Sequence, residues 1–333
     1  MSSNDFIQNA TIRRMDPTRD LNAVANLMEA AFELKKDPEG HVIIENMRQH
    51  ARMIAANDAT LLDKLTVKAS WSDGFVFEDQ NKIVGNITLI PHMDGFKRVI
   101  MIANVSVDDA YRRRGIARAL TLQALQRCRM TGVREVYLQV RHDNQAAIQL
   151  YLDLGFRHLH SVNVWRLRQS ASGLDQLGLN AHALEDGYTL RYRRFGDWQK
   201  HKVWLAECYP QKTRWYSGLA FRQLSPLCWL NPLAWLQLMQ MEHFALSRDG
   251  ELVGVLGLQS HAPQVDMLWL ALPEDLDAAE ENKRAALLLR TFVRERWNHG
   301  KVNLEFPMGR ATAGIQEAGF KLAHDLDWMA LRL

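Results

Sequence analysis

The chain has 333 residues, of which 47% are hydrophobic and 24% charged, and its formal net charge at pH 7 is +3. This length favours two globular domains, and so small a charge gives no argument for a protein that binds nucleic acid. The three cysteines lack the C-x-x-C spacing of a zinc finger and are too few for a disulfide framework, so we expect a protein of the reducing cytoplasm.

Neither a targeting segment nor a membrane span is expected. The N-terminal stretch Met1–Asp16 is polar and has no apolar run, so we expect no signal peptide. The most apolar stretch, Gly218–Met241, is interrupted by Arg222, Pro226 and Pro232. We interpret this stretch as a buried loop and helix, and a surface-docking or hydrophobic-substrate role is the alternative.

The first half of the chain predicts alternating strands and helices. Apolar residues recur at every second position in some segments and at every third or fourth position in others. The expected elements are, in chain order, a strand at residues 11–14, helices over 21–32 and 44–54, a hairpin over 75–85, a strand at 100–107, a helix after residue 115, and strands at 135–140 and 162–167.

The second half repeats this order. Its expected elements are a strand at residues 189–192, a helix over 198–205, a hairpin over 244–254, and strands at 301–306 and 328–333. In each half a Gly-Phe pair, Gly155-Phe156 or Gly319-Phe320, comes before the last strand. We therefore predict an α/β (α+β) fold with two tandem domains, residues 1–170 and 187–333, joined by a linker at 171–186. The alternation predicts a mixed sheet flanked by helices in each domain.

The loop between the strand at 100–107 and the next helix has the composition of an anion site. Its sequence, Arg112-Arg113-Arg114-Gly115-Ile116-Ala117, brings three cations and two small residues to the start of a helix. The first N–H groups of a helix lack internal partners and, with the helix dipole, favour an anion. Since Gly115 and Ala117 let a phosphate approach the backbone, a diphosphate is the expected ligand. An exposed arginine-rich loop before an amphipathic helix is the alternative.

Three separated motifs of the first half occur in a fixed order. The loop reads Arg112-x-x-Gly115-x-Ala117, and the strand before it ends in Val105–Tyr111. Further on stands Asn144-x-x-Ala147-x-x-Leu150-Tyr151-x-x-x-Gly155-Phe156. Together these motifs resemble the GNAT superfamily of N-acetyltransferases, namely its pyrophosphate loop, its fourth strand and its next helix. The resemblance covers about residues 9–167 and implies two tandem GNAT-like domains, each with a mostly antiparallel twisted sheet, of which the second is a diverged copy.

This resemblance implies an enzyme that uses acetyl-CoA as co-substrate. Strands four and five would splay apart, and the pantetheine arm would bond to the backbone of Val105 and Val107. Asn144 would contact the arm near the thioester, and Tyr151 would protonate the leaving CoA thiolate. The pyrophosphate would lie on the loop and helix start formed by Arg112, Arg113, Arg114, Gly115, Ile116, Ala117 and Arg118.

The expected reaction is direct attack of a primary amine on the thioester in a ternary complex. A thiol has a reference pKa of about 8.5 and tyrosine of about 10, so a phenol close by can stabilise or protonate the thiolate. A core aromatic is the alternative for Tyr151. Many family members place a glutamate, as base, where this chain has Asn104, and an asparagine cannot be a base. A relayed water, Glu78, His92 and Asp94 are the candidates for that step.

The second half lacks the residues that carry this chemistry. The loop position becomes Asp277–Asn282, which has no glycine and three carboxylates, and Ile315 stands at the tyrosine position. The asparagine position falls near Met308. We therefore expect a non-catalytic domain that completes the acceptor cleft. Because many GNAT enzymes are dimers, the resemblance implies a monomer with an internal pseudo-dimer, or a weak homodimer.

The predicted function is acetyl transfer to a small-molecule or peptide amine. The alternatives are an acyl-CoA-binding sensor without chemistry and transfer of a longer acyl group. We expect no metal, since His158-x-His160 supplies only two imidazoles, and no nucleic acid, since Arg191–Lys202 is better explained as a solvated edge. The tryptophans Trp198, Trp204, Trp215, Trp229 and Trp235 either pack in the core or line an acceptor pocket.

Overall fold

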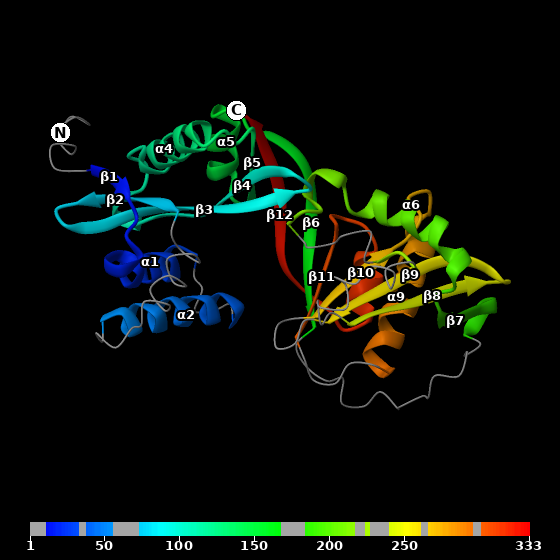
Figure 1. Cartoon of the computed structure of the whole chain (residues 1–333). Helices are drawn as coiled ribbons and strands as arrows, with labels where there is room; N and C mark the ends of the chain where they lie inside the picture. Colours follow the sequence, from blue (N-terminus) through cyan, green and yellow to red (C-terminus); the bar gives the residue numbers. More distant parts are fainter. Residues whose placement is uncertain are drawn as a thin grey trace. The chain divides into compact units, whose positions relative to one another are not determined.

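A computed structural model describes residues 11–32, 38–55, 73–167, 184–216, 224–226, 240–260, 266–295 and 301–333 (Figure 1). The chain forms two compact units. The first contains Met1–Gln139, Gln145–His158 and Met329–Leu333, and the second contains Val140–Asn144 and Leu159–Trp328. The expected linker lies largely outside the described residues, as does most of Gly218–Met241.

The first unit is built on five strands in the order of the sequence. They are β1 (Thr11–Arg14), β2 (Gly74–Asp79), β3 (Lys82–Asp94), β4 (Lys97–Val107) and β5 (Glu135–Arg141). Its helices are α1 (Pro17–Ala31), α2 (Pro38–Ala55), α4 (Ile116–Met130) and α5 (Gln145–Asp153). Neighbouring strands are antiparallel except β4 and β5, which are parallel. Figure 1 shows α1 and α2 on one side of these strands and α4 on the other, which is the layered mixed sheet that the sequence predicted.

The helix starts and apolar stripes follow from local sequence. The Asp16 side chain accepts a hydrogen bond from the N–H of Thr18, and Pro17 occupies the first turn of α1. The stripe of α1 packs on Ile44 and Met47 of α2, which are both buried. On α4 the predicted face Ile116, Leu120, Ala124, Cys128 is buried as well.

Both predicted hairpins are confirmed, and both use turns with positive φ. Gln80 and Asn81 have φ of 48° and 62°, and Asp249 and Gly250 have φ of 51° and 86°. Two left-handed residues in succession match the right-handed twist of the flanking strands, and Asn, Asp and Gly adopt this conformation at least cost.

The second unit repeats the arrangement. Its strands are β6 (Arg157–Leu167), β7 (Tyr188–Tyr192), β8 (Gln240–Arg248), β9 (Glu251–Ser260), β10 (Asp266–Ala271), β11 (Val302–Pro307) and β12 (Lys321–Arg332), in the order β12-β6-β11-β10-β9-β8-β7. Its helices are α6 (Trp198–Cys208), α9 (Ala278–Glu295) and α10 (Thr312–Glu317). The core gathers buried residues of β7 to β11 against α9.

The compact units differ from the two sequence halves in their last strands. β6 follows the first repeat, yet from Leu159 onward it belongs to the second unit, where it pairs antiparallel with β11. The last five residues, Met329–Leu333, belong to the first unit, where the N–H of Leu333 donates to the carbonyl of Arg134 at 2.9 Å. The last strand of the first repeat thus joins the second unit from Leu159 onward, and only the last five residues of the second repeat join the first unit. This exchange is possible because both strands follow the same Gly-Phe turn and carry similar apolar patterns.

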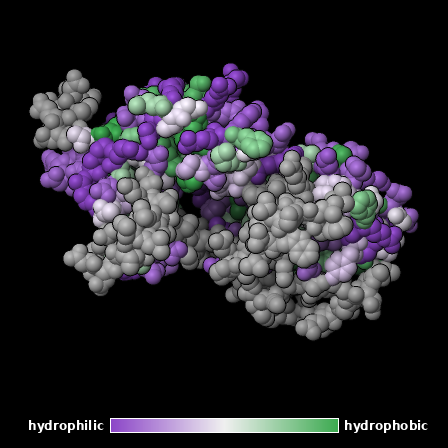
Figure 2. All heavy atoms as spheres, viewed as in Figure 1, coloured by the Kyte–Doolittle hydropathy of each residue, from purple (hydrophilic) through white to green (hydrophobic). Residues whose placement is uncertain are grey.

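The described helices give no candidate for a membrane span, because none combines sufficient length with sufficient apolar character. In the view of Figure 2 the described surface is mostly hydrophilic, with apolar residues scattered over it. The buried apolar side chains gather in the cores of the two units.

Candidate active site

In the first unit β4 extends beyond its pairing with β5. The two strands are parallel, and they are paired only where Ile100–Ile102 lies beside Val136–Leu138. β4 continues beyond this pairing to Val107. The predicted splay is therefore present. Val105 and Val107 lie on this unpaired stretch and are half-buried. An unpaired strand edge offers backbone donors and acceptors to an extended ligand.

A β-bulge at Asn104 interrupts β4 where the splay begins. Asn104 has φ of 54°, and the register with β3 shifts between Asn86 and Thr88. The side-chain amide of Asn86 donates to the carbonyl of Asn104 at 3.0 Å, and that of Asn104 donates to the Thr88 hydroxyl at 3.4 Å. Asparagine adopts the left-handed conformation more readily than most residues, which explains its presence here. Sequence reasoning missed Asn86 and Thr88, although polar residues inside an apolar strand were a visible signal.

The arginine-rich loop forms an open cradle at the start of α4. Arg113 and Gly115 both have positive φ, 66° and 80°, so the backbone turns sharply before the helix. The helix has no side-chain cap, and its first internal hydrogen bond is donated by Ala119 to the Gly115 carbonyl at 3.0 Å. A Cβ at Gly115 would meet no atom within 4 Å. The space beside Gly115 is therefore open, and the first N–H groups of α4 have no side-chain cap, as an anion site requires.

The loop arginines divide into two pairs. Arg112 forms an ion pair with Asp109 at 2.6 Å, and Arg114 donates to the Ala110 carbonyl at 2.9 Å. The Arg114 guanidinium also lies 4.9 Å from the centre of the Tyr111 ring. Arg113 and Arg118 are exposed and bond to no other residue that the structure describes. Arg112 and Arg114 thus fix the loop, and Arg113 and Arg118 are the cations able to move toward a phosphate.

Tyr151 lies on α5, in the same unit as the loop. Its side chain is 6% exposed and meets the Phe156 ring edge-on at 5.7 Å. No described residue forms a hydrogen bond with its hydroxyl. Burial raises the pKa of Tyr151, so the phenol stays protonated and able to donate. Asn144 directly precedes α5 but belongs to the second unit, so its predicted contact with the pantetheine arm stays a prediction.

The three candidate bases differ in their surroundings. Glu78 forms ion pairs with Arg13 at 2.6 Å and with Arg19 at 3.2 Å, which gives it a structural role. Asp94 lies opposite Lys97 in the strand register, at the end of the hairpin that joins β3 to β4. At roughly 3.3 Å per residue, Asp94 lies about 23 Å along β3 from Ile87, the residue opposite the bulge. Burial lowers the pKa of His92, which favours the neutral imidazole.

The second unit keeps the splay but not the cradle. β10 and β11 are paired only as far as Leu268 and Leu304, just as β4 and β5 are paired only as far as Ile102 and Leu138. At the start of α9 the carboxylate of Glu281 forms an ion pair with Arg310 at 2.7 Å and accepts from the N–H of Ala311 at 3.1 Å. Ile315 is fully buried in α10. A carboxylate in this place opposes the binding of a phosphate.

Comparison with known proteins gives a match for the first unit. Residues 27–156 match the model of the family described as Acetyltransferase (GNAT). Mycothiol acetyltransferase of Amycolatopsis mediterranei (strain U-32) is 29% identical over 165 residues, covering 47% of this chain and 49% of that protein. Ribosomal protein bS18-alanine N-acetyltransferase of Escherichia coli (strain K12) is 43% identical over 53 residues, covering 16% of this chain and 36% of that protein.

Among solved structures, the GCN5-related N-acetyltransferase from Sphaerobacter thermophilus superposes with a TM-score of 0.54 at 16% identity, covering 98% of this chain and 96% of that one. At this identity the likeness shows the fold. The chain spans about half the length, or less, of the two curated relatives named above.

Proposed function

We propose that this chain, whose residues 27–156 form a domain of the GNAT acetyltransferase family, moves an acetyl group from acetyl-CoA to a primary amine. The observation that carries the proposal is the open cradle at Gly115, set beside the unpaired edge of β4. An uncapped helix start suits a pyrophosphate, and a free strand edge suits an extended amide-bearing arm.

The residues present fit acetyl-CoA. The backbone of Val105 and Val107 would bond the pantetheine arm, and the N–H groups from Arg113 to Arg118 would hold the pyrophosphate. The side chains of Arg113 and Arg118 would add positive charge, since they are exposed and have no partner among the described residues. Ile116 would contribute only its backbone, because its side chain packs in the core near Gly85.

The chemistry is an acyl transfer. The neutral amine of the acceptor forms a bond to the thioester carbonyl carbon, and the carbon–sulfur bond breaks. Tyr151 would give its phenolic proton to the departing thiolate, since burial keeps that phenol neutral. Asn104 cannot take the proton that the amine must lose, so a relayed water is the route we favour. The acceptor is a small-molecule or peptide amine.

The second unit would not catalyse this reaction. Its cradle position carries Glu281, which forms an ion pair with Arg310, and its tyrosine position is Ile315. The chain would therefore carry one active site, and would act as a monomer with an internal pseudo-dimer or as a weak homodimer. A cytoplasmic location is supported by the two described cysteines, Cys128 and Cys208, which are buried and unpaired.

Thermal unfolding with acetyl-CoA tests the cradle. Ligand at a hundred times its Kd stabilises the folded protein by about 2.7 kcal/mol, so the Tm of the wild type should rise. Gly115→Asp should lose this shift, because its carboxylate occupies the cradle. Gly132→Asp is the matched control, since Gly132 also has positive φ, 73°, and open space at its Cβ position, but lies at the other end of α4.

The same proteins distinguish an enzyme from a sensor. Release of the CoA thiol with a panel of amines should occur in the wild type and the Gly132→Asp control. Binding without thiol release from any amine would favour the sensor function. Absence of any Tm shift in wild type and control would reject the acetyl-CoA site itself.

A further inference from the structure

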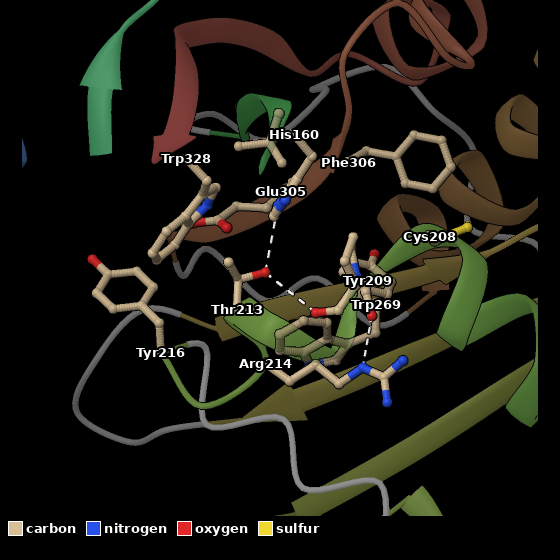
Figure 3. A pocket seen from close by; sticks show the side chains of 12 residues that line it. His160, Cys208, Tyr209, Thr213, Arg214, Tyr216, Trp269, Glu305, Phe306 and Trp328 are labelled. Atoms are coloured by element: carbon tan, nitrogen blue, oxygen red, sulfur yellow. Dashed lines mark hydrogen bonds between the residues drawn. The ribbon is translucent and has the colours of Figure 1, made fainter. Parts of the chain in front are cut away.

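The second unit contains a small cavity that the acetyl-CoA site does not use. It lies between β6, β10, β11, β12 and the segment after α6, and the space open to the centre of a water molecule is ≈ 20 Å³ (Figure 3). One water-sized group needs roughly 10–15 Å³ by this measure. The cavity therefore accepts a single small group and no bulky one. Its walls include His160, Tyr209, Tyr216, Trp269, Glu305 and Trp328.

Glu305 supplies a carboxylate for which the described residues offer no counter-charge. It is the first residue of β11 beyond the last pair with β10, and the first unit has the neutral Gln139 in the corresponding register position. Within the described part of the chain, no group donates a hydrogen bond to this carboxylate or forms an ion pair with it. Burial raises the pKa of Glu305 to about 7. By exposed area Glu305 is half-buried, and a charged carboxylate that is partly withdrawn from water is costly unless a cation accompanies it.

The other titratable groups of the cavity do not supply that cation. Arg214 donates through Nε to the Tyr209 carbonyl at 2.6 Å, and Figure 3 shows its guanidinium turned away from Glu305. The His160 imidazole stacks on Trp328 at 6.2 Å, with Nε2 3.4 Å from the Thr213 hydroxyl. The remaining titratable groups are the phenols Tyr209 and Tyr216 and the thiol of Cys208, which are neutral when protonated.

Aromatic rings form the walls around this carboxylate. Tyr216 and Trp328 meet edge to face with ring centres 5.1 Å apart, and Tyr209 and Trp269 do the same at 5.1 Å. The faces of such rings attract cations. Trp328 is 2% exposed, whereas Tyr216 is 37% exposed and leaves part of its ring to solvent. A carboxylate between aromatic walls is the combination that recognises an organic ammonium group.

We propose that this cavity binds the ammonium group of a small primary amine, with Glu305 as counter-ion and Tyr216 and Trp328 as its walls. The size of the cavity selects a primary ammonium over a quaternary one. This site is separate from the acetyl-CoA cradle and gives the second unit a ligand of its own. Since the unpaired carboxyl holds a proton up to about pH 7, binding should be weak at pH 5.5 and strong at pH 8.5, where an alkylamine is still charged.

Calorimetric titration of the full chain with methylammonium chloride tests the proposal, in phosphate buffer at fixed ionic strength. We expect saturable binding of one equivalent at pH 8.5, and none with tetramethylammonium. Glu305→Gln should weaken binding roughly tenfold to a hundredfold, because it removes the charge and keeps the shape. Glu274→Gln, at an exposed position of the same unit, should bind as wild type does.

Three outcomes would overturn the proposal: no saturable binding by the wild type, equal binding by Glu305→Gln, or equal binding of sodium and methylammonium. Gly115→Asp should still bind methylammonium, so failure of this site and failure of the acetyl-CoA site are distinguishable. Tyr216→Leu gives a second variant that keeps Glu305 and should also weaken binding through loss of one aromatic wall.

Discussion

The hydroxyl of Tyr209 bonds both backbone polar groups of Leu270, accepting from its N–H at 3.0 Å and donating to its carbonyl at 3.2 Å. Leu270 lies on β10 just beyond the last residue paired with β11. In the first unit the corresponding stretch of β4 contains Val105, and no side chain among the described residues bonds the backbone of Val105 in this way. Tyr209 therefore occupies, in the second repeat, the hydrogen-bonding positions that correspond to those we propose for the pantetheine arm in the first repeat.

This relationship predicts that Tyr209→Phe destabilises the chain without opening a second cofactor site. Loss of the hydroxyl leaves a buried N–H and a buried carbonyl unpaired, which costs about 1–3 kcal/mol. The midpoint of urea denaturation should fall accordingly, and calorimetry should still give one acetyl-CoA per chain. A second equivalent of acetyl-CoA bound by the variant would show that Tyr209 alone closes the second repeat.

Tyr151→Phe should separate catalysis from binding. The edge contact with Phe156 survives, so the Kd for acetyl-CoA should change by less than about twofold, whereas turnover should fall roughly 10²- to 10⁴-fold as for loss of a general acid. Because burial raises the pKa of Tyr151, turnover of the wild type should not decline through phenol ionisation below about pH 10. Wild-type turnover in the variant would reject the proton-donor role.

Asn104 should respond to substitution as a bulge residue rather than a catalytic one. Its φ of 54° suits glycine, so Asn104→Gly should keep the free energy of unfolding within about 1 kcal/mol of wild type. Asn104→Val should lose roughly 2 kcal/mol, because a β-branched residue is strained in this conformation. Chemical denaturation of both variants measures the difference. A loss of the same size in Asn104→Gly would assign the stability to the amide bond with Thr88.

Local sequence patterns were sufficient to predict most of the fold. The hairpin turns at Gln80-Asn81 and Asp249-Gly250 were predictable because left-handed turns need particular residues. The buried face of α4 was predictable because its apolar residues recur every fourth position. The cradle at Gly115 was predictable in the same way, since its strand–loop–helix order is written in adjacent residues.

Features that depend on long-range partners could not be predicted in this way. The exchange between β6 and the end of β12 depends on which of two similar units each segment joins, and both segments satisfy either choice by pattern alone. Glu305 stands in an alternating strand, where a carboxylate ordinarily faces water. Only the topology shows that this position opens into a cavity.

Glu305 should make the chain less stable as the pH rises. Its folded pKa is about 7 and its unfolded pKa about 4.3, so the folded state binds more protons between these values and loses stability as the pH increases through them. Glu305→Gln should therefore be the more stable protein at pH 8, by at most about 3.6 kcal/mol, and nearly equal to wild type at pH 4. Thermal unfolding in phosphate, without amine buffers, measures this. A wild type more stable than the variant at pH 8 would mean that the carboxylate has a partner.

Removal of Met329–Leu333 should weaken the first unit, although these residues end the chain. Met329 is 1% exposed, and Leu331 packs near Gly155, so the deletion removes buried apolar surface worth about 1.5–3 kcal/mol for one such side chain. The bond from Leu333 to Arg134, just before β5, is lost as well. Hydrogen exchange of the β5 amides should accelerate, and acetyl-CoA should bind less tightly. Leu322→Ala, at a position of β12 that is 45% exposed, is the control and should leave both measurements unchanged. Unaltered exchange in β5 after the deletion would contradict the assignment of these residues to the first unit.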